Sequence, residues 1–437
     1  MHIALATMTK SLIINVLISF LFCYASSCSE DNSSINERNY YVAPNGNDNN
    51  PGTLSRPWAT FIKAKSVAKA GDTVYFRGGI YPLKVAIFLG GLSGIPDNRI
   101  CYFNYPGERP IFDAKDGLVD DSGIQVYNSS YLHIRGITVR NIRQMTQSTN
   151  ATGIYCYNSN NIIIENCISH DIGVRAYSSH SCDELIYINC DAYNVFDSLS
   201  VDPGQNGDGW LVWDNHNVGY PQDTTKKVYF FGCRAWNCSD DGWDAETEGL
   251  IVFNNCWAFN NIRNGFKLGL ARIRSENVGK KITNCIAAFN GSGFNTNDND
   301  CASKLMYIYN NTSYGNNHGF LIDKTIESSE RELRRVYKNN LSYGNSSSEI
   351  TAFGVSQYTH DHNSWDISGL TIGANDFVSF DSTGLTKQRQ PDFSLPDNDC
   401  YKYFLRLASG CKAIDAGINV GVPFLGKAPD LGAFEKE

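Results

Sequence analysis

The sequence contains a repeat that limits the folds open to it. A short apolar or aromatic run that leads into a cysteine, as in "NIIIENC", "KVYFFGC" and "LIVFNNC", recurs along the middle of the sequence. Most copies follow one another at intervals of 23 to 30 residues, and one interval is 43. A period of this length, built from runs too short to be helices, predicts a solenoid whose coils consist of strands and turns. We therefore predict an all-β fold, a parallel β-helix.

Cysteine occupies one position of this repeat. The aligned cysteines are Cys167, Cys190, Cys233, Cys256 and Cys285, and the register continues through Ile137, Thr312 and Leu341. Strands of adjacent coils lie about 4.8 Å apart, so these residues should form a column inside the solenoid. A buried thiol behaves as a small apolar group, which favours packing over disulfide bonding. The sequence assigns no pairing to the cysteines outside the column, which are Cys182, Cys238, Cys301, Cys400 and Cys411.

Asparagine stands beside the cysteine column in most coils. Its side-chain amide suits tight turns and can satisfy backbone groups from one coil to the next. We therefore predict a turn ladder that consists of Asn166, Asn189, Asn255, Asn284, Asn311 and Asn340.

Two segments are expected to close the solenoid. Residues 60–70 have the apolar spacing of a helix, with Thr60 as a possible N-cap and Gly71 after the last turn. A helix there would cover the open edge of the first coil. After Leu341 the period fades, and we expect an irregular cap at the C-terminal end. Residues 40–437 are thus predicted to form a single domain.

The N-terminus resembles an export signal. An apolar run from Leu12 to Phe22 is too short to span a membrane and is followed by small residues, so residues 1–27 are predicted to be a signal peptide. The segment "ASSC" that ends at Cys28 resembles a bacterial lipobox, and the acidic "SED" after it resembles the surface signal of some Bacteroidetes lipoproteins. We expect Cys28 to carry a lipid and residues 28–39 to be a linker. This places the protein at the outer membrane or cell surface of a Gram-negative bacterium, or otherwise in the periplasm.

The charge of the chain excludes one class of partner. The formal net charge is -8 and the sequence pI is about 5.5, and no basic run of the kind that follows a nucleic acid backbone occurs. We therefore expect no nucleic acid partner, and an acidic ligand must be held by a local site. Because both ends of the solenoid are expected to be capped, we predict a monomer.

A second repeated element, glycine followed by an aromatic residue, comes after the cysteines. The pairs begin at Gly209, Gly242, Gly265, Gly293 and Gly319. If each ring points into the core, strand alternation turns the next residue outward. The outward column then consists of Leu211, Asp244, Lys267, Asn295 and Leu321. The residues before the glycines are Asp208, Asp241, Asn264, Ser292 and His318.

Acidic residues gather in two of these coils. The motif "DGW" occurs at 208–210 and again at 241–243, so Asp208 and Asp241 should occupy equivalent positions, with Asp240 and Asp244 beside them. Four carboxylates without histidine or cysteine suggest a hard cation. Calcium, which takes about 6 to 8 oxygen ligands, fits better than zinc or copper, and magnesium stays open. The alternative is a solvated acidic ridge on the solenoid.

Lys267 is predicted to lie beside Asp244, because each follows the cysteine of its own coil by 11 residues. A salt bridge alone would explain the pair. A bound divalent cation, however, lowers the pKa of a neighbouring ammonium group, which makes Lys267 a candidate base. Cation and base together suit β-elimination at a uronic acid, in which C5 loses its proton and the C4 glycosidic oxygen leaves.

The site segments "NGDGW", "SDDGWD" and "NGFKLG" resemble polysaccharide lyase family 9. The likeness runs over residues 40–437, where the opening "YYVAPNGNDNNPGTLSRPWATF" and the ending "AIDAGINVGVPFLGKAPDLGAFE" are less specific. The resemblance implies a right-handed parallel β-helix and calcium as the cofactor. Carried over through the matching motifs, it implies Lys267 as the Brønsted base and a set of calcium ligands that consists of Asp208, Asp240, Asp241 and Asp244.

The family resemblance implies a pectic substrate, either homogalacturonan (pectate) or the rhamnogalacturonan I backbone, and 4,5-unsaturated uronate ends as products. A fully charged pectate chain usually calls for a strongly basic groove. The cations near the predicted site are few, namely Arg234, Arg263, Arg272 and Arg274. Rhamnogalacturonan I, with half as many carboxylates per sugar, is therefore slightly favoured over pectate. Arg263 is a candidate for binding a substrate carboxylate, with a structural salt bridge as the alternative.

Two other functions fit parts of the pattern. An inverting hydrolase of the polygalacturonase type needs two carboxylates roughly 6.5 to 9.5 Å apart, which the aspartates could supply. The sequence lacks the Gly-His-Gly and Arg-Ile-Lys segments of such enzymes, and hydrolysis gives Lys267 no role. A non-catalytic glycan binder would use calcium only to hold the coils together.

Overall fold

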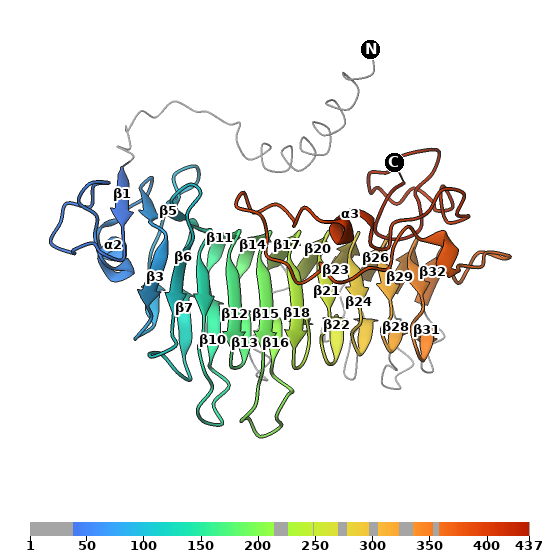
Figure 1. Cartoon of the computed structure of the whole chain (residues 1–437), viewed down its shortest axis with the longest axis horizontal. Coiled ribbons are helices and arrows are strands. Elements are labelled where there is room, and N and C mark those ends of the chain that lie inside the picture. The colour runs from blue at the N-terminus through green and yellow to red at the C-terminus, as the bar shows by residue number, and fades with distance from the viewer. Residues whose placement is uncertain are drawn as a thin grey trace, which may run out of the picture.

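The computed structural model describes residues 38–213, 226–247, 249–269, 278–296, 305–322, 335–352 and 358–436. These residues form a parallel β-helix in which each coil gives one strand to each of three sheets (Figure 1). The pairings are parallel and join neighbouring coils, as in the central pairs of each sheet. The predicted all-β solenoid is confirmed.

The strands of the three sheets follow one another in the order of the coils. Sheet 1 consists of β1 (Asn39–Val42), β2 (Thr73–Phe76), β5 (Ile100–Asn104), β8 (Leu132–Arg135), β11 (Asn160–Glu165), β14 (Asp183–Ile188), β17 (Lys227–Phe231), β20 (Leu250–Asn254), β23 (Val278–Thr283), β26 (Leu305–Tyr309), β29 (Arg335–Lys338) and β32 (Tyr358–Asp361). Sheet 2 consists of β4 (Ile87–Gly90), β7 (Ser122–Tyr127), β10 (Thr152–Tyr157), β13 (Arg175–His180), β16 (Asp208–Trp213), β19 (Trp243–Glu246), β22 (Asn264–Lys267), β25 (Ser292–Asn295), β28 (His318–Ile322) and β31 (Ser348–Ala352). Sheet 3 consists of β3 (Gly79–Pro82), β6 (Pro110–Asp113), β9 (Thr138–Arg140), β12 (Ile168–Ile172), β15 (Asp191–Val195), β18 (Arg234–Cys238), β21 (Trp257–Phe259), β24 (Ile286–Ala288), β27 (Thr312–Tyr314) and β30 (Leu341–Tyr343).

The cysteine column lies inside the solenoid, as predicted. Its members, with Ile137 at the head, have no exposed surface and follow one another in register: Cys167, Cys190, Cys233, Cys256 and Cys285. The predicted continuation through Thr312 and Leu341 is wrong by one residue. Thr312 pairs with Ile286, the residue after the last cysteine, so Asn311 and Asn340 occupy the column.

The asparagines therefore have two separate functions. One set lies at turn corners in the left-handed region, with φ between 50° and 58°, and consists of Asn166, Asn189, Asn255, Asn284, Asn310 and Asn339. Asparagine tolerates this conformation better than most residues. The second set, Asn311, Asn340 and Asn363, is fully buried. The Asn340 Oδ1 accepts the Asn311 backbone N–H at 3.1 Å, and its Nδ2 donates to the Asn363 Oδ1 at 2.7 Å. The predicted amide ladder thus exists, but in these three coils.

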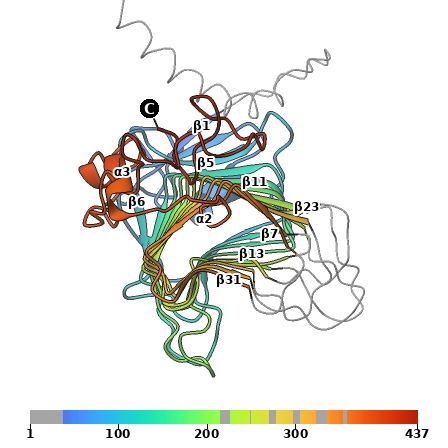
Figure 2. The same cartoon turned by 90° about the vertical axis from the view of Figure 1, so that its right-hand side faces the viewer.

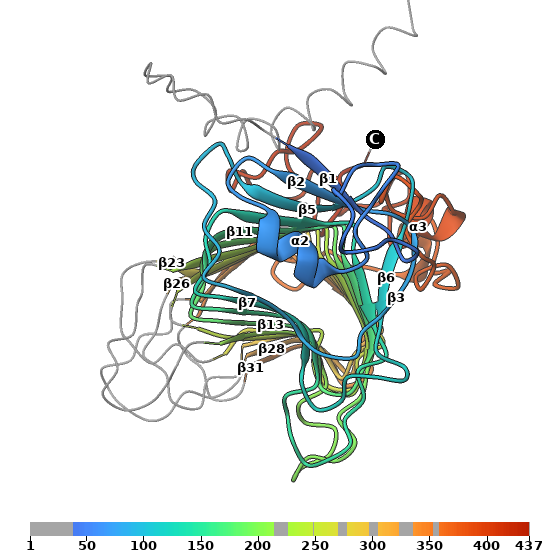
Figure 3. The same cartoon turned by 90° about the vertical axis from the view of Figure 1, so that its left-hand side faces the viewer.

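A helix covers the N-terminal end of the solenoid. Helix α2 spans Phe61–Val67, and the Thr60 side chain caps it by accepting the Lys63 backbone N–H at 3.0 Å. Figure 3 shows the helix across the first coil. It is shorter than predicted because Ala68 is already extended, with a ψ of 137°. Phe61 is buried against Phe76 and Tyr102, which seals the end of the core.

The C-terminal segment is an irregular cap that also runs back along the solenoid (Figure 1), and the end-on view shows it on the outside of the coils (Figure 2). It contains the short helices η1 (Ala374–Asp376) and α3 (Asp399–Tyr403). Its apolar residues cover outward rings of sheet 3, and together these form a second core with Trp236, Phe259 and Phe404. The Arg109 side chain, in the second coil, donates to the carbonyl oxygen of Arg389 at 2.8 Å.

Other predictions concern cysteines and the N-terminus. Cys238, Cys400 and Cys411 are buried free thiols, Cys182 is also buried, and Cys301 lies outside the described residues. The predicted signal peptide, residues 1–27, and Cys28 also lie outside them, as does most of the linker. In the part of the chain that the structure describes, no helix has the length and apolar character needed to cross a membrane.

The buried amide ladder should be essential for stability. Replacing Asn340 by alanine leaves the Asn311 N–H and the carbonyl of Ile308, which accepts from Asn340 at 2.7 Å, without their partners. Each unsatisfied buried group costs about 1 to 3 kcal/mol, so we expect Asn340→Ala to lower the free energy of unfolding by about 2 to 5 kcal/mol. Urea denaturation measures this change. The matched control is Asn49→Ala, at an exposed turn, where a loss of equal size would contradict the ladder's role.

Candidate functional site

A stack of rings inside sheet 2 sets the direction of the residues around it. The inward side chains Trp210, Trp243 and Phe266 are fully buried, and their ring centroids are 4.8 Å apart with interplanar angles of 4° and 1°. Because side chains alternate along a strand, the residue after each ring faces outward. Asp244 and Lys267 are consequently direct neighbours on the outer face, as predicted.

Glycine before each ring allows the coils to approach closely. A Cβ placed on Gly242 would lie 2.6 Å from the carbonyl oxygen of Gly265, which is closer than real side chains come. The residue before this glycine is Asp241, and Asp208 precedes the glycine of the preceding coil. The coil-to-coil contact therefore brings these two carboxylates together.

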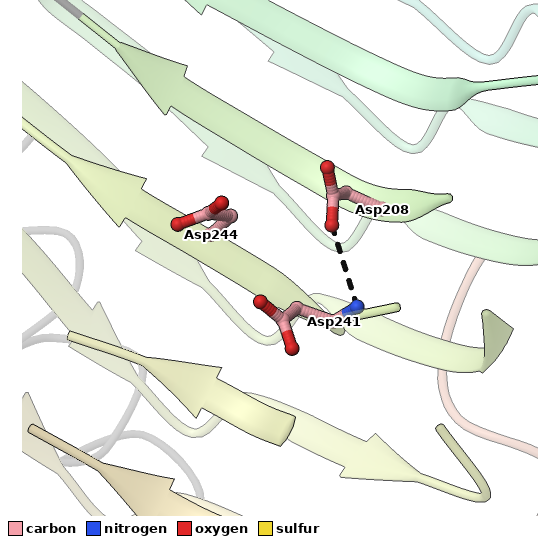
Figure 4. A group of neighbouring side chains, drawn as sticks. All are labelled: Asp208, Asp241 and Asp244. Atoms are coloured by element: carbon pink, nitrogen blue, oxygen red, sulfur yellow. Dashed lines mark hydrogen bonds between the residues drawn. The ribbon is translucent and has the colours of Figure 1, made fainter. Parts of the chain in front are cut away.

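Three carboxylates form one group at this place (Figure 4). Asp208, Asp241 and Asp244 each offer an oxygen atom, and these atoms all lie within 4.8 Å of one another. The three residues are only 2%, 1% and 8% exposed. The Asp208 Oδ1 accepts the backbone N–H of Asp241 at 3.3 Å, and the buried Oδ1 of Asp244 has no hydrogen-bond partner.

Asp240 lies beside this group rather than within it. Its Oδ1 is 3.4 Å from the Nε of Arg263, whose side chain is half exposed. Its charge still contributes to raising the pKa of Asp208, after the larger effects of burial and of Asp244. The structure thus brings three of the four predicted aspartates into one group and places the fourth at its edge with Arg263.

Lys267 contacts the carboxylates directly. Its Nζ is 2.7 Å from Asp244 Oδ2, 3.1 Å from Glu246 Oε1 and 4.0 Å from Asp241 Oδ2. Burial alone would lower the pKa of Lys267, but the charges of Asp244, Asp241 and Glu246 raise it well above its usual value. Without a cation in the group, the amine is therefore an ammonium ion.

The three grouped carboxylates are unfavourable as anions. Burial raises the pKa of Asp208 and of Asp241 far above the usual range, and their like-charged neighbours add to the effect. Burial also raises the pKa of Asp244 to about 7, although Lys267 opposes the change. A cation would relieve this cost, and an all-oxygen donor set with one unpartnered oxygen is what a hard ion such as calcium needs. The residues present thus fit calcium.

Two neighbours of the site were missed by the sequence analysis, Glu246 as a lysine partner and Arg175 as a flanking cation. Arg175 pairs in register with Asp208, and its Nε is 3.8 Å from Asp208 Oδ2. The repeat register could have predicted this position, because Arg175 occupies the place equivalent to Asp208 one coil earlier. The placement of Arg234 near the site is wrong, since Arg234 lies on sheet 3 and is buried under the C-terminal segment, where its Nε is 2.9 Å from Asp191 Oδ1. The remaining candidates, Arg272 and Arg274, lie outside the described residues.

The comparisons with known proteins agree on one family. A family model described as a Pel9A-like right-handed β-helix region matches residues 40–363. Pectate lyase L of Dickeya dadantii is 29% identical over 451 aligned positions, which cover 96% of each chain. Pectate lyase L of Paenibacillus polymyxa is 29% identical and covers 87% of this chain and 84% of its own.

Two solved structures resemble this chain over most of its length. The crystal structure of pectate lyase Pel9A superposes with a TM-score of 0.74 at 28% identity, over 92% of this chain and 96% of that one. A rhamnogalacturonan lyase superposes with a TM-score of 0.69 at 26% identity, over 85% and 97%. The resemblance to polysaccharide lyase family 9 and the right-handed coil are confirmed. The protein belongs to the Pel9A-like right-handed β-helix family, and it is a polysaccharide lyase.

Proposed function

We propose that the protein cleaves a galacturonate-containing pectic polysaccharide by calcium-assisted β-elimination, with Lys267 as the base. The observation that supports this most directly is the lysine amine 2.7 Å from a carboxylate of a buried three-aspartate group, on the outer face of sheet 2. The names of the relatives, pectate lyases and a rhamnogalacturonan lyase, support a pectic substrate.

The proposed calcium ligands are Asp208, Asp241 and Asp244, with Asp240 at the edge of the group completing the set. Bound calcium would neutralise these carboxylates and a uronate carboxylate of the substrate, which acidifies the hydrogen on C5. Because these acids hold Lys267 protonated in the metal-free protein, neutralising them also favours the free amine.

In the proposed reaction, the Lys267 amine takes the proton from C5 of the galacturonate. The electron pair of that C–H bond forms the C4–C5 double bond, and the bond between C4 and the glycosidic oxygen breaks. The departing oxygen takes a proton and becomes the hydroxyl of the new reducing end. Arg263, half exposed beside Asp240, is proposed to bind a substrate carboxylate.

The geometry argues against the hydrolase alternative. One oxygen from each of Asp208, Asp241 and Asp244 lies within 4.8 Å of the others, whereas an inverting hydrolase needs roughly 6.5 to 9.5 Å between its acid and its base. A non-catalytic binder would give no reason to bury an amine among the metal ligands. Within the pectic substrates we favour rhamnogalacturonan I over pectate, because the described cations at the site are only Lys267, Arg263 and Arg175.

The cell location is proposed from the N-terminal sequence alone. We infer that the chain is exported and that Cys28 carries a lipid that anchors it at the outer membrane or cell surface. A monomer at that surface, with a pectic polysaccharide as its partner, agrees with the capped ends of the coil.

Replacement of Lys267 should abolish elimination. We expect Lys267→Ala to lower kcat by about 10²- to 10⁴-fold, because general base catalysis contributes that much, while substrate binding is retained. The measurement is the ultraviolet absorbance of unsaturated uronate ends. Lys281→Ala is the matched control, a partly exposed lysine on the outer face of sheet 1. Full activity of Lys267→Ala would exclude the lysine as the base.

Calcium and pH should be linked through the buried acids. The pKa of Asp244 is about 7 in the folded metal-free protein and about 3.9 when unfolded, so the folded state binds more protons between these values. The stability that this group contributes is therefore present below about pH 4 and is lost as pH rises through 7. We expect calcium to raise the melting temperature more at pH 8 than at pH 5.

The matched variant for this measurement is Asp244→Asn, which is neutral at every pH. Its melting temperature relative to the parent should rise from pH 5 to pH 8 in chelator, and calcium should stabilise it less. If calcium does not change the melting temperature of the parent protein at either pH, the proposed ligand set is contradicted.

The substrate is tested by supplying each polymer separately. We expect the purified protein to form unsaturated ends from rhamnogalacturonan I faster than from pectate, with calcium present, and to form none in chelator. Faster cleavage of pectate would identify the protein as a pectate lyase of the same mechanism. New reducing ends without the chromophore would show hydrolysis instead.

A further inference from the structure

The outer face of sheet 2 carries a line of aromatic side chains that leads to the candidate site. The outward positions of β4, β7, β10, β13 and β16 hold Phe88, Tyr127, Tyr155, Tyr157, His180 and Trp213. Trp213 pairs in register with Glu246, which contacts Lys267. The line, here called the aromatic surface, is therefore continuous with the proposed active site.

The rings contact one another from coil to coil. The ring centroids of Phe88 and Tyr127 are 5.4 Å apart, those of Tyr127 and Tyr157 5.0 Å, and those of Tyr157 and His180 5.1 Å. The His180 and Trp213 centroids are 4.5 Å apart. With strands spaced about 4.8 Å, the four steps from β4 to β16 make the surface roughly 19 Å long.

The rings are not one parallel stack. The Tyr127 and Tyr155 rings meet at 85°, and the Tyr157 and His180 rings at 79°. The rings therefore differ in orientation along the surface, and His180 is the most buried of them at 9% exposed. Phe88 is 48% exposed, and the three tyrosines are partly exposed.

The strands of this surface carry little charge, and Lys65 of α2 places its Nζ 5.3 Å from the Phe88 ring centroid at the N-terminal end. Strands β4, β7, β10, β13 and β16, which the structure describes in full, contain no lysine and one arginine, Arg175. Arg175 lies at the start of β13, where it faces Asp208 and donates to the carbonyl oxygen of Thr149 at 2.9 Å. A chain with a carboxylate on every sugar would leave most of those charges unpaired here. Phenol rings instead match the apolar C–H faces and the hydroxyl groups of uncharged sugars.

The outward positions in line with Lys267 continue beyond the site. Beyond Lys267, the next outward residues of sheet 2 are Asn295, Leu321 and Thr351, none of them aromatic. A glycan that extends from the site in the N-terminal direction meets the rings, whereas the positions in line with Trp213 beyond Gly269 lie outside the described residues. A pyranose unit advances a glycan by a distance similar to the strand spacing, so successive sugars can lie over successive coils.

We propose that the aromatic surface is an extended binding site for neutral sugar residues of the substrate, several units away from the bond that is cleaved. The proposal rests on the proposed function for the position of that bond. The proposed substrate is then a polysaccharide in which uronates alternate with neutral sugars. The tyrosines would determine the specificity for long chains.

The test compares long and short rhamnogalacturonan I oligosaccharides on Tyr127→Ala and Tyr157→Ala. For long chains we expect KM to rise about tenfold with kcat unchanged, the loss typical of one aromatic contact at an interface. For chains too short to reach the tyrosines we expect no change. Tyr307→Ala, a partly exposed tyrosine on the outer face of sheet 1, is the matched control.

Several outcomes would overturn the proposal. Equal losses for short and long chains would indicate a structural role, and unchanged KM values would mean that the surface binds nothing. A galacturonan oligosaccharide of the same length should depend less on the tyrosines, and an equal dependence would contradict the preference for neutral sugars. If an alanine variant does not fold, Tyr157→Leu keeps an apolar side chain without the ring and is measured in its place.

Binding without turnover separates this proposal from the proposed function. Titration calorimetry of the parent and the tyrosine variants with the long oligosaccharide, in chelator, needs no catalysis. Weaker binding by the variants supports the aromatic surface even if the parent forms no unsaturated ends from any pectic polymer. Equal binding by parent and variants overturns the aromatic surface even if the parent proves to be an active lyase.

Discussion

Equivalent residues of successive coils stack closely, and this stacking sets the position of every other side chain in the solenoid. Trp210, Trp243 and Phe266 lie over one another at 4.8 Å, and this fixes the strand register to one residue. A slip of one position would turn every outward side chain into the core. Since Asp244 and Lys267 each follow such a ring, the apolar stack is what holds the acid and the amine in contact.

The same stacking imposes an electrostatic cost. Carboxylates at equivalent positions of adjacent coils, such as Asp208 and Asp241, have no room to separate, and burial makes their ionised forms unfavourable. A folded chain tolerates such buried carboxylates if protons neutralise them or if a cation, either a side chain or a bound ion, balances their charge. Lys267 compensates only in part, because Asp244 keeps a raised pKa despite a 2.7 Å contact with its ammonium group. In the proposed reaction, an external cation is the compensation that leaves the Lys267 amine free to act as a base.

The sequence period was sufficient to predict what repeats, namely the sheets, the cysteine column and the outward neighbours Asp244 and Lys267. It failed where residue type changes within a column. Asn311 and Asn340 replace cysteine inside the coil, and the tandem asparagines of "NNT" and "NNL" concealed the shift of one residue. It also failed for Arg234, because the C-terminal segment that buries it has no period. Side-chain direction at a turn, which separates Asp240 from the other acids, depends on backbone detail that a period does not contain.

Another buried acid of the molecule shows why the aspartate group is different. Asp191 is 1% exposed, about as buried as Asp241, yet its pKa is lowered, because the attraction of Arg234 and Arg389 outweighs the effect of burial. Both arginines hydrogen-bond to its carboxylate at 2.9 Å. That triad joins the C-terminal segment to sheet 3 and is complete within the chain. Among the described residues, no arginine lies at hydrogen-bond distance from Asp208, Asp241 or Asp244, so an external cation is the proposed source of the remaining charge balance.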